Sequence, residues 1–417
     1  MPWLQARLED PTDNWIRFPN GFVNVPMCCP SRASILTGQY AHHHGVTSNR
    51  LGEKLDDTKT LATWLDAAGY RTGLFGKYLN DYGSRWRKPA TYIPPGWDEW
   101  VAWLSDGLIY FDYGINDNGT IVSHGSAPED YSTDVYRDAV IDFIESTPPS
   151  QPFFVHFSPN APHKPLTRAP RHENVWQTGP NVRNPSWNEA DVSDKPAWVR
   201  NLQPLSPSAQ TQQDTNRRAQ YGTLAAADEA IAQIVATLEE RGELEETVII
   251  VLSDNGFAFG EHRWTDKGCP YEACSRVPFF VRYPGAFART ASGFVSNVDV
   301  APTFVDLADA TATRPMDGVS LDALIRGSAP TWRDEAFIEF SGLPGGYGPA
   351  FERLRTPQFS YTEYGSGEIE LYDLAGVLRP ADPDELANVC PGLPAVCQPA
   401  YAAIRADLAA RLQAYRD

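Results

Sequence analysis

The stretch that most constrains the fold is "TVIIVLSDNG", residues 247–256. Its β-branched and aliphatic residues run without polar alternation, which is typical of a β-strand buried on both faces. It follows a helical pattern over residues 219–242, and Gly242 is a favourable residue at a helix C-terminus. A helix, a buried strand and a polar loop in that order predict a parallel sheet with functional residues at the carboxyl ends of its strands. We therefore expect an α/β fold.

The remaining patterns divide the chain into two parts. An apolar run within residues 151–163 stops at proline and asparagine, as expected of a second buried strand. Beyond about residue 330, "EAFIEF", "QFSYTEY" and "EIELYDL" predict short strands, and an amphipathic helix closes the chain. We expect a large domain over residues 1–330 and a small α+β subdomain over residues 331–417. The Pro- and Asn-rich stretch 165–210 is interpreted as a surface excursion.

The composition excludes some classes of partner. The chain has 417 residues, of which 42 % are hydrophobic, so a large core is available. Its 35 basic and 53 acidic residues give a net charge of −18, which argues against nucleic-acid binding. No apolar run approaches the roughly 18 residues that a membrane span needs. An anionic substrate remains compatible with this charge, because a few local cations decide such binding.

Four of the six cysteines are spaced for small loops. Cys390 and Cys397 could pair, as could Cys269 and Cys274, and free thiols are the alternative in each case. Disulfides would suit an exported protein. The sequence leaves both the pairing and the compartment open.

The other two cysteines are adjacent in "VPMCCPSRASILTGQY", residues 25–40. Pro30 suits the first turn of a helix that ends at Gly38. Cys28 would then lie at the helix N-terminus, where unpaired N–H groups favour negative charge and acidify a thiol. Arg32, about one turn later, can point toward the same place. The pattern indicates a reactive cysteine beside an anion site, with a buried structural cysteine pair as the alternative.

The string Cys-x-Pro-Ser-Arg-x-Ser-x-Leu-Thr-Gly, from Cys28 to Gly38, resembles the signature of the formylglycine-dependent sulfatases at every fixed position. The resemblance implies an alkaline-phosphatase-like α/β sandwich with a large, mostly parallel central sheet. It also implies that a formylglycine-generating enzyme oxidises Cys28 to the aldehyde 3-oxoalanine (formylglycine). The hydrate of that aldehyde attacks the sulfur of a sulfate ester and later expels the bound sulfate. Cys29 occupies the free position of the motif.

Further motifs of this family follow in order. "FGKYLNDYG" (75–83) is similar to the form found in N-acetylglucosamine-6-sulfatases and extracellular heparan sulfatases. By resemblance, the predicted catalytic residues are Cys28, Arg32, Lys77, His163 and Lys267. The predicted substrate-binding residues are Asn80, His42, His44 and His262. Taken singly, these side chains have ordinary structural interpretations, such as a surface lysine or a loop histidine.

The resemblance also assigns a metal, a substrate and competing functions. Asp254 and Asn255 match two oxygen ligands of the family's divalent cation, usually calcium, although Asp-Asn-Gly is also good turn chemistry. The expected function is hydrolysis of a sulfate monoester on a sugar, such as N-acetylglucosamine 6-sulfate. The alternatives are an aryl sulfatase, a phosphonate or phosphate monoester hydrolase, and a non-catalytic protein that binds sulfated glycans.

One family feature is expected to be missing. Sulfatases normally place a buried strand ending in Asp-Asp a few tens of residues before the cysteine motif, and here 27 residues precede Cys28. "MPWLQARL" resembles the helix that follows that strand. We expect a late start, a fragment or a degenerate member, and hence a poorly folded or metal-deficient protein.

Overall fold

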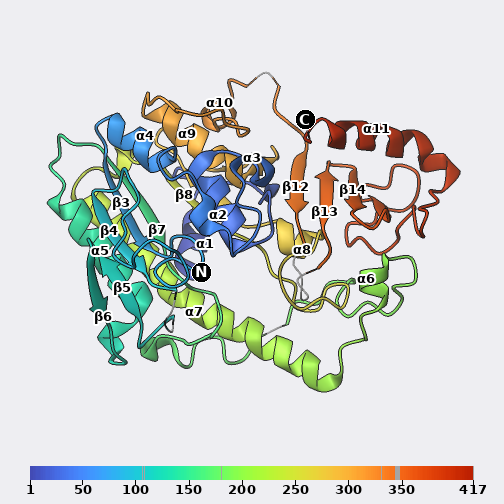
Figure 1. Ribbon diagram of the computed structural model, residues 1–417, viewed down its shortest axis with the longest axis horizontal. Coiled ribbons are helices and arrows are strands. Elements are labelled where there is room, and N and C mark those ends of the chain that lie inside the picture. Colours follow the sequence, from blue (N-terminus) through green and yellow to red (C-terminus); the bar gives the residue numbers. More distant parts are fainter. Residues whose placement is uncertain (106, 108, 180, 330, 343–347, 417) are drawn as a thin grey trace.

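Helices and strands alternate along most of the chain in the computed structural model (Figure 1), which describes residues 1–417 except 106, 108, 180, 330, 343–347 and 417. The helices are α1 Pro2–Glu9, α2 Cys28–Thr37, α3 Ala41–His44, α4 Leu61–Ala67, α5 Ser132–Ser146, α6 Ala197–Arg200, α7 Pro207–Glu240, α8 Glu272–Ser275, α9 Val300–Leu307, α10 Asp322–Ile325 and α11 Ala402–Gln413. Short 3₁₀ turns cover Gly52–Lys54, Pro128–Asp130, Pro170–His172, Leu244–Glu246, Asn297–Asp299 and Pro399–Tyr401.

The larger part of the molecule contains two principal β-sheets. The first has the order β6-β5-β4-β3-β7, with β3 Arg71–Gly76, β4 Glu99–Trp103, β5 Gly114–Asp117, β6 Thr120–Ser123 and β7 Phe153–Ser158. The second has the order β10-β1-β9-β8, with β1 Trp15–Arg17, β8 Ile249–Leu252, β9 Phe279–Arg282 and β10 Arg289–Thr290. A small parallel pair joins β2 Gly21–Phe22 to β11 Val295–Ser296.

Helices cover both faces of the first sheet. On one face, Phe75 of β3 packs against Phe143 of α5 and Leu238 of α7. On the other face, Phe154 of β7 packs with Leu65 of α4 in a cluster that also includes α9. Burial of these apolar faces is the main source of stability for such layers. The expected α/β sandwich is therefore present.

The sheet differs from one large parallel sheet because it is divided in two. Strand β3 pairs in parallel with β4 and β7, whereas β4 with β5, β1 with β9 and β8 with β9 are antiparallel. Strands β7 and β8 lie at the ends of their sheets. Among the described residues, no strand connects these two edges.

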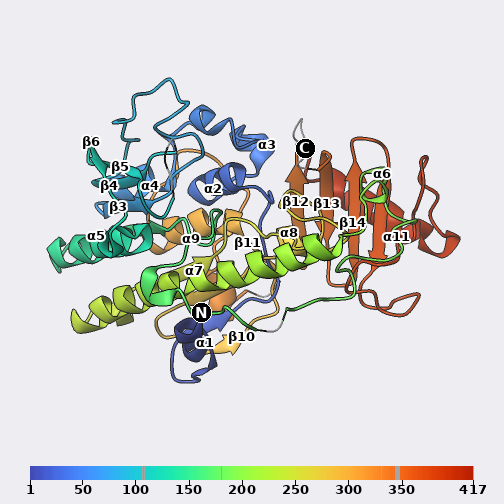
Figure 2. The ribbon, with the colours of Figure 1, turned by 90° about the horizontal axis from the view of Figure 1, so that it is seen from below.

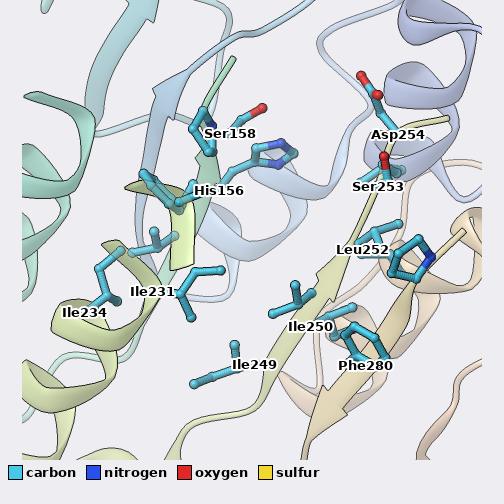
Figure 3. Close-up of a pocket in the computed structure, with 18 of the residues that line it drawn as sticks. His156, Ser158, Ile231, Ile234, Ile249, Ile250, Leu252, Ser253, Asp254 and Phe280 are labelled. Atoms are coloured by element: carbon cyan, nitrogen blue, oxygen red, sulfur yellow. The ribbon is translucent and has the colours of Figure 1, made fainter. Parts of the chain in front are cut away.

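A cavity of about 1650 Å³ lies between β7 and β8. Figure 3 shows the isoleucines Ile231, Ile234, Ile249 and Ile250 pointing into it, with His156, Ser158, Ser253 and Asp254 beyond them. The residues of β8 are half-buried rather than fully buried, because one side of the strand meets this cavity. The expectation of a strand buried on both faces is therefore wrong for β8 in this structure.

The longest helix, α7, begins at Pro207 rather than at residue 219. The side chain of Ser206 accepts a hydrogen bond from the backbone N–H of Ala209, and proline occupies the first turn, so both start signals are present. The first turns of α7 are largely solvent-exposed and polar, which removes the apolar periodicity that sequence patterns rely on. Figure 2, in which the molecule is seen from below, shows α7 crossing in front of the larger part toward the C-terminal sheet.

The C-terminal residues form the expected α+β arrangement. Antiparallel strands β12 Ala336–Phe340, β13 Phe351–Arg355, β14 Phe359–Tyr364 and β15 Ile369–Asp373 are ordered sequentially, and α11 packs on them through Leu408 and Leu412. Residue 330, where we expected the larger domain to end, lies outside the described residues, so that boundary stays a prediction. No described helix combines the length and apolar character needed to cross a membrane.

We predict that an apolar strand supplied to the cavity stabilises the protein. Met1 lines the cavity, so a six-residue Val/Ile segment fused ahead of it through a short linker can reach the edges of β7 and β8. Each apolar side chain buried there contributes about 1.5–3 kcal/mol before ordering costs. We expect the midpoint of thermal unfolding to rise by at least about 5 °C in scanning calorimetry.

The matched control for this fusion replaces the apolar residues of the segment by serine and asparagine. Its midpoint should equal that of the unfused chain. Equal midpoints for the apolar and polar fusions would show that the cavity does not accept a strand.

Candidate active site

Cys28 is the first residue of α2, and its side chain lies on the wall of the cavity. The residue is 2 % exposed, and its Sγ atom lies 2.7 Å from the Nζ atom of Lys267. Burial opposes ionisation of the thiol, but the positive charges of Lys77 and Lys267 outweigh it and lower the pKa of Cys28. For Cys29, burial raises the pKa to about 12. The structure thus separates a reactive thiol from an inert one.

Arg32, one turn further along α2, joins the ends of three strands. Its Nε donates a hydrogen bond to Oδ2 of Asp254 at 2.7 Å. Its Nη1 donates to the backbone oxygen of Lys77 at 2.8 Å and to Oγ of Ser158 at 2.5 Å. Lys77 follows β3, Ser158 ends β7 and Asp254 follows β8. The carboxyl ends of these strands therefore meet at the N-terminal turn of α2, as expected for a site in an α/β fold.

Lys77 and Lys267 give the site its positive charge. Burial lowers the pKa of Lys77, which is only 5 % exposed. Burial also opposes the charge of Lys267, but Cys28 and Asp254 outweigh it and raise the pKa of Lys267. Together with Arg32, three cationic side chains surround one carboxylate. Such an excess of positive charge at a cavity wall favours a bound anion.

His163 lies at the rim of the cavity in the loop after β7. It is solvent-exposed, and its Nδ1 lies 2.7 Å from the carbonyl oxygen of Lys164, so Nδ1 is the protonated nitrogen of the neutral ring. Partial loss of water where the ring meets the cavity, together with the charges of Lys77 and Lys267, lowers the pKa of His163 to about 4. The Nε2 atom therefore carries a lone pair at neutral pH.

Asn160 and Ser158 are site residues that sequence reasoning missed. Asn160 lines the cavity and is 4 % exposed, and neither of its side-chain polar atoms has a hydrogen-bond partner among the described residues. Unpartnered buried amides are costly unless a ligand or water satisfies them. Both residues sit at the carboxyl end of the strand that precedes "APHKP", so the strand-end rule applied to residues 158–160 would have found them.

Asp254 and Asn255 present oxygen atoms that suit a hard divalent cation. Burial opposes ionisation of Asp254, but Arg32, Lys77 and Lys267 outweigh it and hold the pKa of that carboxyl well below its usual range. The Oδ1 atom of Asn255 is buried without a partner in the described part of the chain. Calcium usually takes six to eight oxygens. The donor chemistry therefore fits, but these two side chains supply only part of a coordination sphere.

The described residues contain no group of three or more His, Cys, Asp or Glu side chains arranged to hold a metal ion. The histidines of residues 42–44 accordingly do not form such a group. His42 Nδ1 lies 2.9 Å from Oε1 of Glu339 on β12, and the buried His44 contacts Oγ of Ser34 through Nε2 at 3.0 Å. Neither residue is among those lining the cavity, so their roles in substrate binding stay predictions.

His262 and Asn80 also lie away from the cavity lining. His262 is buried, stacks on Tyr271 and places Nδ1 2.7 Å from Oε2 of Glu189. The side-chain oxygen of Asn80 is buried without a partner in the described part, and its backbone oxygen accepts a hydrogen bond from Trp86. The substrate contacts expected for these two residues stay predictions.

Both cysteine pairs that the sequence left open form disulfides. The Cα atoms of Cys269 and Cys274 are 5.6 Å apart, and Cys390 is bonded to Cys397. The free thiols of the described chain are Cys28 and Cys29.

An acidified thiol, three cations and a carboxylate–amide pair lie together at the carboxyl ends of strands, an arrangement that favours a bound anion. A family model described as Sulfatase matches residues 2–310, and one described as N-sulphoglucosamine sulphohydrolase, C-terminal, matches residues 260–417. The chain belongs to the sulfatase family.

Individual relatives agree with this assignment. The chain is 32 % identical over 419 residues to the N-acetylglucosamine-6-sulfatase of Homo sapiens, covering 89 % of this chain and 74 % of that protein. It is 35 % identical over 349 residues to the extracellular sulfatase SULF-1 homolog of Drosophila melanogaster, covering 79 % of this chain and 30 % of that protein. A match to the N-acetylglucosamine-6-sulfatase of Capra hircus spans 60 % of that protein. The chain thus spans between about a third and three quarters of these relatives.

Solved structures confirm the expected fold. A protein in complex with its substrate D-glucosamine-2-N,6-O-disulfate superposes with a TM-score of 0.83 at 25 % identity, over 100 % of this chain and 93 % of that chain. The phosphonate monoester hydrolase of Agrobacterium radiobacter gives a TM-score of 0.77 at 23 % identity, over 100 % and 90 %, which shows the fold alone. The alkaline-phosphatase-like sandwich with a C-terminal antiparallel sheet is therefore established.

We predict that Lys267→Met raises the pKa of the unmodified Cys28 thiol. The change removes the contacting ammonium group but keeps most of the side-chain volume. The apparent pKa, measured from the pH dependence of iodoacetamide alkylation at Cys28, should rise by about one unit. The control is Lys59→Met, because Lys59 forms a surface ion pair with Asp56 and does not line the cavity. An unchanged profile for Lys267→Met would contradict the contact.

Proposed function

We propose that the protein hydrolyses a sulfate monoester on a sugar, of the N-acetylglucosamine-6-sulfate type, after a formylglycine-generating enzyme has oxidised Cys28. Ester and water would give the free sugar hydroxyl and inorganic sulfate. The observation that carries the proposal is the cradle around Cys28, in which Lys267 contacts Sγ and Lys77 and Arg32 supply further positive charge. The names of the human, goat and fly relatives support the substrate class.

Each side chain has a distinct task in this proposal. Formylglycine at position 28, when present and hydrated, supplies an oxygen nucleophile in place of the thiol. Lys77 and Lys267 bind the sulfate oxygens and offset their charge. Asn160 offers an amide N–H to the same ligand, because its side chain faces the cavity without a partner. His163 holds a proton at Nε2 for the leaving oxygen when it is in its charged form.

A divalent cation, calcium in this proposal, would be held by Oδ1 of Asn255 and the carboxylate of Asp254. It would polarise the sulfate and supply positive charge at the nucleophile. Arg32 orients the Asp254 carboxylate through a direct hydrogen bond. Since two side-chain oxygens leave most of a calcium coordination sphere to other donors, weak binding is expected.

The decisive test measures sulfate release by this chain co-expressed with a formylglycine-generating enzyme. N-acetylglucosamine 6-sulfate, a chromogenic aryl sulfate and a phosphonate monoester are assayed while calcium is titrated. We expect calcium-dependent turnover of the sugar sulfate, and Cys28→Ala should lower it by at least about 10³-fold, because the nucleophile is removed. Mass spectrometry of the Cys28 peptide reports the extent of modification.

Other outcomes of this test select other functions. A preference for the aryl sulfate or the phosphonate would mean that the same site acts on that class of ester rather than on a sugar sulfate. Tight binding of sulfated sugar without turnover, in fully modified protein, would favour a non-catalytic glycan-binding protein.

We also predict that kcat/KM declines as pH rises. If His163 donates a proton to the leaving oxygen, kcat/KM reports the free enzyme and requires the protonated ring. The pKa of about 4 means that this form is lost as pH rises through 4. Above that value kcat/KM should fall about tenfold per pH unit, and His163→Ala should abolish this dependence. His43→Ala, at an exposed histidine paired with Asp317, should retain it. A pH-independent kcat/KM between pH 4 and 7 would contradict the assignment.

A further inference from the structure

The disulfide between Cys269 and Cys274 lies beside the site, two residues after Lys267. Both cysteines are completely buried, and the second belongs to α8. Residues 263–271 around Lys267 form an irregular segment outside any helix or strand. The disulfide therefore joins an otherwise irregular lysine-bearing loop to a short helix.

Hydrogen bonds also anchor the loop near Lys267. The backbone N–H of Ala258 donates to the carbonyl oxygen of Asp266 at 3.0 Å, and Nη1 of Arg353 donates to the carbonyl oxygen of Pro270. The backbone N–H of Gly268 donates to the carbonyl oxygen of Pro26 at 3.0 Å, and the indole N–H of Trp264 donates to the carbonyl oxygen of Lys267 at 3.0 Å. The backbone N–H of Lys267 donates to the adjacent Asp266 carboxylate, a local contact that does not fix the loop on the fold. The disulfide adds a covalent restraint two residues from Lys267 to these hydrogen bonds.

The same disulfide also touches the segment that carries Asp254 and Asn255. The carbonyl oxygen of Cys274 accepts a hydrogen bond from the backbone N–H of Gly256 at 2.9 Å. A Cβ atom on Gly256 would lie 2.3 Å from the carbonyl oxygen of Ala273, so only glycine permits this approach. One end of the disulfide therefore adjoins the sulfate-binding lysine, and the other contacts the residue after the proposed cation ligands.

We propose that the Cys269–Cys274 disulfide is a positioning element of the active site. It holds Lys267 against residue 28 and supports the backbone that follows Asn255. Breaking it is expected to release the lysine while the rest of the fold remains. The effect of the disulfide on the contact between Lys267 and Cys28 concerns the unmodified protein. Only the expected change in kcat/KM rests on the proposed function.

The second disulfide provides a matched control. Cys390 and Cys397 bound a short segment of the C-terminal subdomain, and neither residue lines the cavity. Its sequence separation of 7 is close to the separation of 5 for the first disulfide, so the two crosslinks restrict the unfolded chain to a similar extent. Loss of either disulfide should lower the stability of the protein to a similar extent. A change in the position of Lys267 should appear only when the Cys269–Cys274 disulfide is removed.

The test compares C269A/C274A with C390A/C397A, both prepared without the maturation enzyme so that Cys28 remains a thiol. The apparent pKa of Cys28 is measured from the pH dependence of iodoacetamide alkylation, read by mass spectrometry. We expect C269A/C274A to reproduce most of the rise caused by Lys267→Met, about tenfold less thiolate at a given pH. Adding Lys267→Met to it should raise the pKa no further, since both changes remove one contact. C390A/C397A should match the wild type.

A second variant covers the case in which C269A/C274A does not fold. Insertion of two glycines between Gly268 and Cys269 keeps the disulfide but uncouples it from Lys267, and it should raise the thiol pKa equally. A wild-type pKa in either folded variant would overturn the proposal. After maturation, the insertion variant should lose at least about tenfold in kcat/KM against the C390A/C397A control. Absence of turnover in every protein, including the wild type, would contradict the proposed function but leave the thiol result to decide the positioning role.

Discussion

The arrangement of the site depends on the guanidinium group of Arg32. It forms an ion pair with Asp254 and hydrogen bonds with the backbone after β3 and with Ser158 at the end of β7. A planar group with five donors can satisfy acceptors in several directions at once, which the ammonium group of lysine cannot do. Removing the guanidinium group would leave Asp254, the Lys77 carbonyl oxygen and Ser158 without their common donor. One side chain on α2 thus holds together elements from both halves of the divided sheet.

The contacts of Arg32 are important because, in the described structure, no strand pairing connects the two sheets. Strands β7 and β8 approach the same arginine at their carboxyl ends, while along their length they are separated by the apolar cavity. Backbone hydrogen bonds therefore cannot transmit position from one sheet to the other. The relative placement of Ser158 and Asp254 rests on Arg32 and on the helices that cover both edges. The polar site and the apolar cavity are consequently parts of one continuous space (Figure 3).

The sequence predicted much of this fold because local patterns were strong where burial was complete. The segment 151–163, the C-terminal strands and the closing helix appear close to where their apolar patterns indicated. The cysteine motif predicted a helix with Pro30 in its first turn and Cys28 just ahead of it, and in the structure the helix begins at Cys28 itself. The start of α7 was missed because its first turns are exposed and polar, and the half-exposed state of β8 could not be foreseen from its own residues. That state depends on what lies beside the strand, which is a tertiary property.

The same distinction explains the candidate site residues. Cys28, Arg32, Lys77, His163, Asp254, Asn255 and Lys267 all line one cavity, although they lie up to 239 residues apart in sequence. Spacing alone could not have joined them, and the family resemblance supplied that link. His42, His44, His262 and Asn80 instead lie outside the lining, because local packing and hydrogen bonding engage them elsewhere. Asn160 illustrates the reverse case, since its place at a strand end made it a candidate and its unpartnered burial in three dimensions identifies it.

The two lysines of the site are held by different physical means. Lys77 directly follows β3, and its backbone N–H continues the pairing with β7 by donating to the carbonyl oxygen of Ser158 at 2.8 Å. Gly76, with a φ of 110°, allows this close approach, because a Cβ atom there would lie 2.2 Å from the same oxygen. Lys267 has no strand to fix it and depends on a crosslinked loop. In the anion site, pairing between β3 and β7 fixes the position of Lys77, whereas the crosslinked loop fixes the position of Lys267. The position of Lys267 can therefore be changed without disturbing the sheet.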